Sequence, residues 1–303
     1  MLDGGMRIVA KFSRIIDQRR LLMKNLDEFK KAGEDIYGKL HLATYPVAIT
    51  YIKEEGKIPK GTFRPSKAGK KLSLCQAITL SRRWGLHVAM TADDNFCTPA
   101  TAFHGWVDIS KEDVIESQVR QGWHKDRQAE ERRIEGAWAL LRSKGADRLK
   151  EYCGFVSSPL KDTKMIPDTV LIYGDGVQIT HMIQAICYEY KQIVHSFFEG
   201  FGESCVKGGL IPFLLDSPQV VIPGMGDRSF AGIGDNELAI GMPSHALFPL
   251  LENLFKAGGS MNIGYPAKTL LPMDITEHIT PGFQYLRDKI NEKKSSESKK
   301  SRV

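Results

Sequence analysis

Residues 168–190 read DTVLIYGDGVQITHMIQAICYEY, a short run rich in β-branched and aromatic residues followed by a longer apolar run. Short runs of the first kind are typical of strands, whereas apolar residues spaced three and four apart are typical of helices. The sequence therefore predicts a strand at 168–174 and a helix at 177–190.

The same pattern continues on both sides of this segment. Further strands are predicted at 45–52, 86–92, 192–198, 219–224 and 237–243, and further helices at 15–40, 75–84 and 244–258, with a charged helical region at 110–152. Alternating strands and helices favour an α/β or α+β fold, in which helices pack on a sheet and an amphipathic helix begins the domain.

The chain has 303 residues, of which 42% are hydrophobic, so it can bury a large core. We interpret 21–288 as a single domain, with 155–168 as the place where two subdomains could meet. Residues 1–20 are an extension, and the basic, polar tail at 289–303 is predicted to be disordered.

Charge and hydropathy exclude some classes of protein. No apolar run is long enough to cross a bilayer, and the N-terminal residues lack a secretory signal, which favours a cytoplasmic protein without a membrane contact. The net charge is +6, and the segment 57–83 holds eight basic residues and no acidic one. That segment is either a solvated basic face or a source of positive potential that attracts an anionic cluster, an anionic substrate or an acidic redox partner. Because the segment contains only one aromatic residue, Phe63, nucleic-acid binding is disfavoured.

Three of the five cysteines share one local setting. Cys75, Cys97 and Cys205 each follow a polar or glycine-rich turn and begin an apolar, helix-like run, whereas Cys187 lies inside an apolar run and is predicted to be core. A helix N-terminus lowers the pKa of a thiol and so favours the thiolate that metals bind. We therefore predict that these three thiols share one metal site.

Other features leave alternatives open. The three cysteines are too far apart for a zinc ribbon or a bacterial ferredoxin, and buried inert thiols are common. His104 follows Cys97 by seven residues and could face the same side. Gly226 and Arg228, in the turn PGMGDR, could hold an anion through backbone N–H groups and the guanidinium fork, although the same turn could be purely structural.

The succession YPVAITYI, LCQAITLSRR, FCTPATAFHG, GFGESC and VIPGMGDR, with ELAIGMP after it, resembles the domain of unknown function 169 family over about 21–257. The resemblance implies a protein of mainly anaerobic bacteria and archaea, with cysteines at the positions of Cys75, Cys97 and Cys205. The family pattern often has a further cysteine near the glycine-arginine turn, where this chain has Gly224 and Met225. If these cysteines hold a metal cluster, its fourth ligand would then be non-cysteinyl.

The leading hypothesis is one [4Fe–4S] cluster on Cys75, Cys97 and Cys205, serving electron transfer or small-anion chemistry at an open iron. The partner would be a small anionic ligand or a redox protein, and a homo-oligomer is compatible with the sequence. One alternative is a metal-free small-molecule-binding or regulatory protein with structural cysteines. Another is an enzyme with Cys205 or Cys97 as nucleophile beside His104. No general base is identifiable, so enzymatic activity is left open.

Overall fold

The structure is a computed structural model, and it describes part of the chain. The described residues are 24–143, 149–189, 193–198, 204–259, 264–265 and 281–300. The predicted extension at 1–20 and the first part of the predicted helix at 15–40 lie outside them. None of the described helices is both long and apolar enough to span a lipid bilayer.

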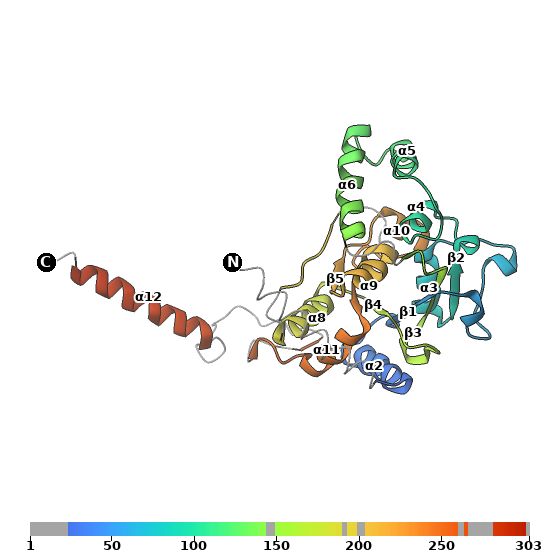
Figure 1. The fold of residues 1–303 in the computed structure, drawn as a ribbon. Coiled ribbons are helices and arrows are strands. Elements are labelled where there is room, and N and C mark those ends of the chain that lie inside the picture. Colours follow the sequence, from blue (N-terminus) through green and yellow to red (C-terminus); the bar gives the residue numbers. More distant parts are fainter. Residues whose placement is uncertain are drawn as a thin grey trace.

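Six strands form one antiparallel sheet at the centre of the molecule (Figure 1). They are β1 (Val47–Ile52), β2 (Val88–Thr91), β3 (Gly154–Pro159), β4 (Thr169–Gly174), β5 (Gln219–Val221) and β6 (Leu238–Pro243). Their order across the sheet is β2-β3-β1-β4-β6-β5. Because every neighbouring pair is antiparallel, the mixed fold is of the α+β kind that the sequence allowed.

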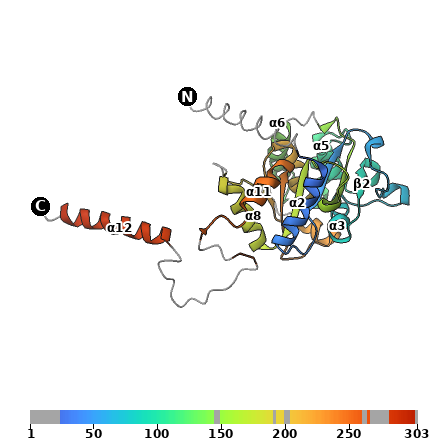
Figure 2. The same cartoon turned by 90° about the horizontal axis from the view of Figure 1, so that it is seen from below.

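Helices cover both faces of the sheet. They are α2 (Leu26–Lys39), α3 (Leu74–Trp84), α4 (Thr98–Phe103), α5 (Lys111–Gln121), α6 (Arg127–Ser143), α8 (Gly176–Glu189), α9 (Ile211–Leu215), α10 (Met225–Ala231), α11 (Leu247–Asn253) and α12 (Pro281–Lys300). Figure 2 shows α2, α8 and α11 together on one face, and these helices contact one another. The other face carries α3, α9 and α10 together with the π-helix η5 (Ser204–Leu210).

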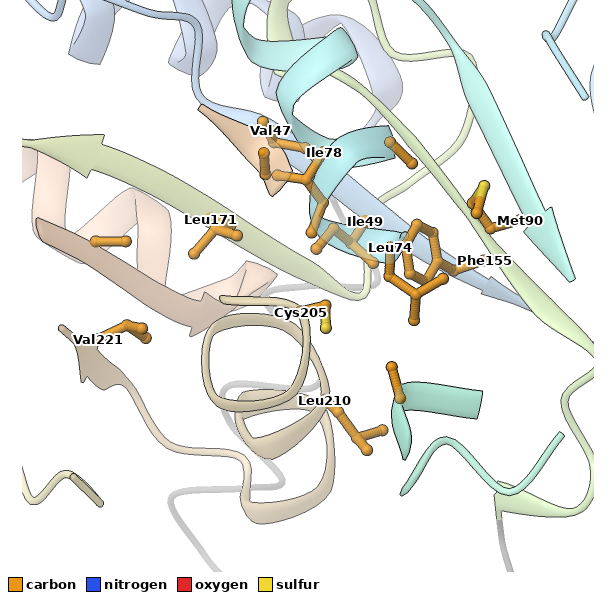
Figure 3. Close-up of a cluster of buried hydrophobic side chains, with 14 of the residues drawn as sticks. Val47, Ile49, Leu74, Ile78, Met90, Phe155, Leu171, Cys205, Leu210 and Val221 are labelled. Atoms are coloured by element: carbon orange, nitrogen blue, oxygen red, sulfur yellow. The ribbon is translucent and has the colours of Figure 1, made fainter. Parts of the chain in front are cut away.

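The strands are mostly apolar, and side chains on both faces of the sheet are buried. In β4, Leu171 and Tyr173 join the cluster under α3 and η5, whereas Val170 and Ile172 join the cluster under α2 and α8. Successive side chains of a strand point to opposite faces, which accounts for this division. Figure 3 shows the first cluster, in which Cys205 and Leu210 of η5 pack against the strands.

Most predicted elements are confirmed, and the differences have local causes. The strands predicted at 45–52, 86–92, 168–174, 219–224 and 237–243 correspond to β1, β2, β4, β5 and β6. The prediction of a strand at 192–198 is wrong for its described residues 193–198, which have no regular structure. The helix predicted at 244–258 begins later, at Leu247 of α11, whose N-cap is Ala246.

The sequence analysis missed β3, which lies at the point where two subdomains could meet. Its sequence, GFVSSP, contains glycine, serines and proline, which rarely signal a strand. The fully buried Ser157 is satisfied by a hydrogen bond to Ser81 of α3, with 2.9 Å between the hydroxyl oxygens. The position of β3 between β2 and β1 makes this segment an interior part of one sheet.

The disorder predicted at 289–303 stays a prediction, although the described part of this tail has helical backbone. Its residues up to Lys300 continue α12, which stands apart from the sheet and its helices (Figures 1 and 2). Alternating lysine and glutamate residues support a solvated helix through pairs such as Lys289 and Glu292, which are 2.8 Å apart. The tail therefore has helical backbone although its described side chains are almost all exposed.

Candidate functional site

A cavity of about 870 Å³ lies beside the sheet face that α3 and η5 cover. Cys75, Cys97 and Cys205 all line it, and each comes from a different segment of the chain. Folding therefore brings the three predicted ligands to one place. Cys153 and Cys187 do not line this cavity.

Cys75 lies in the first turn of α3, whose start is fixed by a capping box. The backbone N–H of Gln76 donates to the Ser73 hydroxyl (3.0 Å), and the Ser73 N–H donates to the Gln76 side-chain oxygen (2.8 Å). The sequence Ser-Leu-Cys-Gln matches the serine-x-x-glutamine pattern of this motif. The cap thus fixes the position of Cys75 in the cavity wall.

Cys97 is the N-cap residue of α4, and Asn95 holds its backbone. The N–H of Cys97 donates to the Asn95 side-chain oxygen (3.0 Å), and the Asn95 amide donates to the Cys97 carbonyl (3.0 Å) and the Thr101 hydroxyl (2.7 Å). The thiol makes no capping hydrogen bond of its own. Asn95 therefore fixes the backbone of Cys97 at the start of α4, and Cys97 lines the cavity.

Asp94 anchors the loop before Cys97 and gives a pH-dependent prediction. Burial alone would raise its pKa, but hydrogen bonds from Arg64 and Ser66 outweigh that effect and lower the pKa to about 2. A depressed pKa contributes stability that is present above the unfolded-state pKa, about 3.9, and is lost as the pH falls towards 2. Asp94→Asn should lower the free energy of unfolding by about 2–3 kcal/mol at neutral pH. In urea titrations the difference should shrink below about pH 3.5, whereas Asp93→Asn, at an exposed neighbour, should change little.

Cys205 is the second residue of η5, a π-helix. Such i→i+5 turns are rare and recur at functional sites. Two glycines let η5 lie directly on β6: a Cβ on Gly241 would be 1.9 Å from the carbonyl oxygen of Gly208. This close approach of backbone to backbone places Cys205, which is 5% exposed, at the floor of the cavity.

The thiols interact with one another, and this changes their acidity. A hydrogen bond with Cys205 and burial raise the pKa of Cys75 well above its usual value. Burial and the neighbouring Cys205 raise the pKa of Cys97 to about 11. The expectation that helix N-termini would lower these pKa values is wrong for Cys75 and Cys97, because burial and like neighbours outweigh the helix dipole. A bound cation would reverse that balance and favour the thiolates.

Asp227 is a site residue that the sequence analysis did not select. It is fully buried, lines the cavity and hydrogen-bonds with Cys75. One of its oxygens also accepts from the backbone N–H groups of Ser204 and Gly224, each at 3.2 Å. One carboxylate therefore ties together the starts of η5 and α10 and the first turn of α3.

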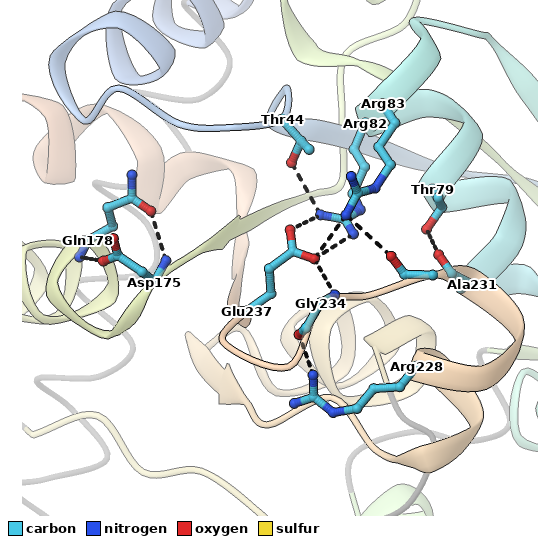
Figure 4. A network of polar contacts seen from close by, with 11 residues as sticks. Thr44, Thr79, Arg82, Arg83, Asp175, Gln178, Arg228, Ala231, Gly234 and Glu237 are labelled. Carbon is cyan, nitrogen blue, oxygen red and sulfur yellow. Dashed lines mark hydrogen bonds and ion pairs between the residues drawn. The ribbon is translucent and has the colours of Figure 1, made fainter.

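The glycine-arginine turn is the start of α10, and only part of it reaches the cavity. Gly226 lines the cavity, as predicted, but Arg228 does not. Its guanidinium donates to the carbonyl of Gly234 (Figure 4). Met225, which stands where the family often has a further cysteine, is 58% exposed and also lies outside the cavity lining. The structure thus gives no support for an anion-binding role of Arg228 in this cavity.

His104 lies in the aromatic core and outside the cavity lining. It is 1% exposed, its Nδ1 is 2.8 Å from the Ala100 carbonyl oxygen, and its ring centroid is 5.0 Å from that of Trp106. Burial lowers its pKa to about 4, which favours the neutral imidazole. Because His104 does not contact Cys97 or Cys205 through any hydrogen bond of the described residues, a cysteine–histidine nucleophile has no geometric support.

The basic segment 57–83 is partly internal. Arg64 pairs with Asp94 and Arg82 pairs with Glu237, and both arginine side chains are less than a tenth exposed. These charges are therefore largely compensated by carboxylates from outside the segment. The cations that line the cavity come from elsewhere, namely Arg132, Arg133 and Lys207.

The donor set suits a metal centre by its chemistry, since thiolates are the preferred ligands of iron–sulfur clusters. Among the described residues, however, no group of three His, Cys, Asp or Glu side chains is arranged to hold a single metal ion. The thiols border a cavity of about 870 Å³ instead.

Comparisons with known proteins point to one family. The family model for domain of unknown function 169, described as an uncharacterised ArCR, matches residues 35–253. An uncharacterised protein of Methanocaldococcus jannaschii is 22% identical over 230 residues, which cover 75% of this chain and 94% of that protein. No solved structure matches this chain.

Proposed function

This chain belongs to the domain of unknown function 169 family, and we propose that it is an iron–sulfur protein in which Cys75, Cys97 and Cys205 hold one [4Fe–4S] cluster. The observation that carries the proposal is the meeting of three thiols, far apart in sequence, around one cavity. Soft thiolate ligands favour iron–sulfur centres over oxygen-ligated ions. Both the family and the relative are described as uncharacterised.

The electrostatics of the cavity support a cationic guest. Cys75 and Cys97 have raised pKa values, and Asp227 is buried beside Cys75. Thiols and a carboxylate packed together repel one another when ionised, and a metal centre would relieve that repulsion while it releases the thiol protons. Lys207 and Arg132 at the wall would offset the net negative charge of a thiolate-bound cluster.

The described part of the cavity offers three cysteines and no fourth. The fourth iron is therefore proposed to have a non-cysteinyl ligand. When bound, such a cluster supplies electron transfer or, at the iron without a cysteine, a site for a small anion. The corresponding partners are a redox protein or an anionic ligand. A reducing, cytoplasmic location is part of the proposal, because free thiols persist there.

The test is the absorption spectrum of protein purified without oxygen. We expect a broad iron–thiolate band at about 400 nm, with roughly four irons and four sulfides per chain. Cys75→Ser, Cys97→Ser and Cys205→Ser should each lose most of this band. Cys187→Ser is the matched control, because Cys187 is a partly buried cysteine outside the cavity, and it should keep the full band.

A colourless protein with no bound iron, even after reconstitution with iron and sulfide, would refute the cluster and favour the metal-free alternative. Loss of the band in Cys187→Ser as well would show that the assay reports folding and not ligation. Circular dichroism of each variant separates these cases, since a correctly folded Cys205→Ser without iron supports direct ligation.

A further inference from the structure

The cavity beside the three thiols has aromatic walls. The aromatic residues in its lining are Phe96, Phe103, Trp123, Phe197, Phe198 and Phe230. Most of these are more exposed than large apolar side chains usually are, with 44% for Phe96 and 61% for Phe230. Exposed apolar groups gathered around a concavity mark a ligand site more often than a solvated surface.

The walls are assembled from segments far apart in the chain. Phe96 precedes α4 and Phe230 belongs to α10, yet their ring centroids are 6.0 Å apart in an edge-to-face arrangement. Trp123 lies between α5 and α6, and Phe197 lies in 193–198. No local apolar pattern of one helix explains this convergence of aromatic residues on one cavity.

The charged residues of the lining are mainly cations. Arg132, Arg133 and Lys207 line the cavity, against one carboxylate, Asp227. Arg133 is neutralised by the buried Glu130, 2.7 Å away. Arg132 is exposed at the cavity wall and has no ion pair with any described residue, and Lys207 is 8% exposed. The exposed cation at the cavity wall is therefore Arg132.

We propose that this cavity binds an organic anion with a planar, apolar body. The body would lie against the aromatic side chains of the lining, and the acidic group would be held by Arg132. The cavity volume of about 870 Å³ lies within the range of pockets that hold drug-sized ligands, about 300–1,000 Å³. An inorganic anion would leave most of the apolar wall in contact with water.

This inference deepens the proposed function by naming the ligand class of the same cavity, and it rests on that function only for the role of the ligand beside the cluster. Binding itself depends on walls that the protein supplies. It can therefore be measured on iron-free and iron-loaded protein alike, so the two proposals can fail separately.

The experiment titrates the protein with 1-anilinonaphthalene-8-sulfonate, a planar aromatic anion, and with the uncharged N-phenyl-1-naphthylamine, and follows their fluorescence. We expect one saturable site per chain for the sulfonate. Arg132→Gln should weaken the sulfonate by about tenfold and the neutral probe by less than about twofold, since one charge-assisted contact is worth about 1.4 kcal/mol. Trp123→Ala should weaken both probes.

Arg120→Gln is the matched control, because Arg120 is an exposed arginine of the same helical region that does not line the cavity. It should change neither affinity. Equal sulfonate binding in Arg132→Gln, or binding at many sites, would refute the proposal. Sedimentation velocity tests whether the aromatic rim is instead a contact between copies of the chain. If Phe230→Ser changes the oligomeric state without changing probe affinity, the rim is such a contact and the proposal is wrong.

If iron-free protein binds the sulfonate at one site but no cluster can be reconstituted, the ligand site stands and the iron–sulfur proposal falls. If the cluster forms and neither form of the protein binds the probe, the cluster stands and the ligand class proposed here is wrong.

Discussion

Glu237→Ala should lower the free energy of unfolding by about 3–5 kcal/mol, because it leaves a buried arginine without its counter-charge. Arg82 is fully buried on α3, and its two terminal nitrogens are 2.5 Å and 3.0 Å from the Glu237 carboxylate. Its guanidinium also lies 4.1 Å from the centre of the Tyr173 ring. Figure 4 shows the Glu237 carboxylate joined by dashed lines to both Arg82 and Arg83.

The two partners of this ion pair are not equally exposed, which gives the prediction a direction. Glu237 is 20% exposed and also contacts Arg83, whereas Arg82 has no access to solvent. Arg82→Met, which replaces the charge by an apolar chain of similar length, should therefore cost less than Glu237→Ala. Urea unfolding measures both changes.

The control for this prediction is a surface ion pair. Lys53 and Glu151 are each more than half exposed, and Glu151→Ala should change the free energy of unfolding by less than about 1 kcal/mol. A loss in Glu237→Ala no larger than that of the control would show that Arg82 is solvated in the folded protein. The buried pair fixes α3 against the segment before β6, and α3 carries Cys75 at its other end.

The strands were predictable where residues that favour strands dominate the sequence. β1 and β4 consist almost entirely of β-branched, apolar and aromatic residues, because both of their faces are buried. β3 was not predictable, because its serines and glycine acquire their role only through neighbours such as Ser81. Local pattern therefore identified strands with intrinsic preference and missed the strand that depends on tertiary contacts.

The site was predictable in the same partial way. The turn-to-helix setting of Cys75, Cys97 and Cys205 is a local signal, and these residues do border one cavity. The choice of Arg228 over Asp227 had no local signal to decide it. Adjacent helical residues point about 100° apart, so when Asp227 faces the thiols Arg228 must point elsewhere. The aromatic walls come from separate segments, and no single stretch of sequence reveals them.

The position of Cys205 depends on a contact between two glycines, so Gly241→Ala should disturb the site from a distance. A Cβ at Gly241 would lie 1.9 Å from the carbonyl oxygen of Gly208 and 2.7 Å from its Cα. Both atoms are backbone, so no side-chain rotation can relieve the clash, and η5 must move away from β6. We expect a loss of about 1–3 kcal/mol in the free energy of unfolding, together with loss of most of the iron–thiolate absorption.

Substitutions at two further glycines can be compared with Gly241→Ala. A Cβ at Gly208 would lie 2.5 Å from a terminal methyl carbon of Leu171, a side chain that can turn aside, so Gly208→Ala should cost less than Gly241→Ala. Gly38→Ala meets nothing within 4 Å at the end of α2 and should leave absorption unchanged. The order Gly241, Gly208, Gly38 in lost absorption would show that the approach of η5 to the sheet sets the place of Cys205. If Gly241→Ala loses stability but keeps full absorption, a ligand role for Cys205 would not depend on this approach, and the backbone contact would serve the core alone.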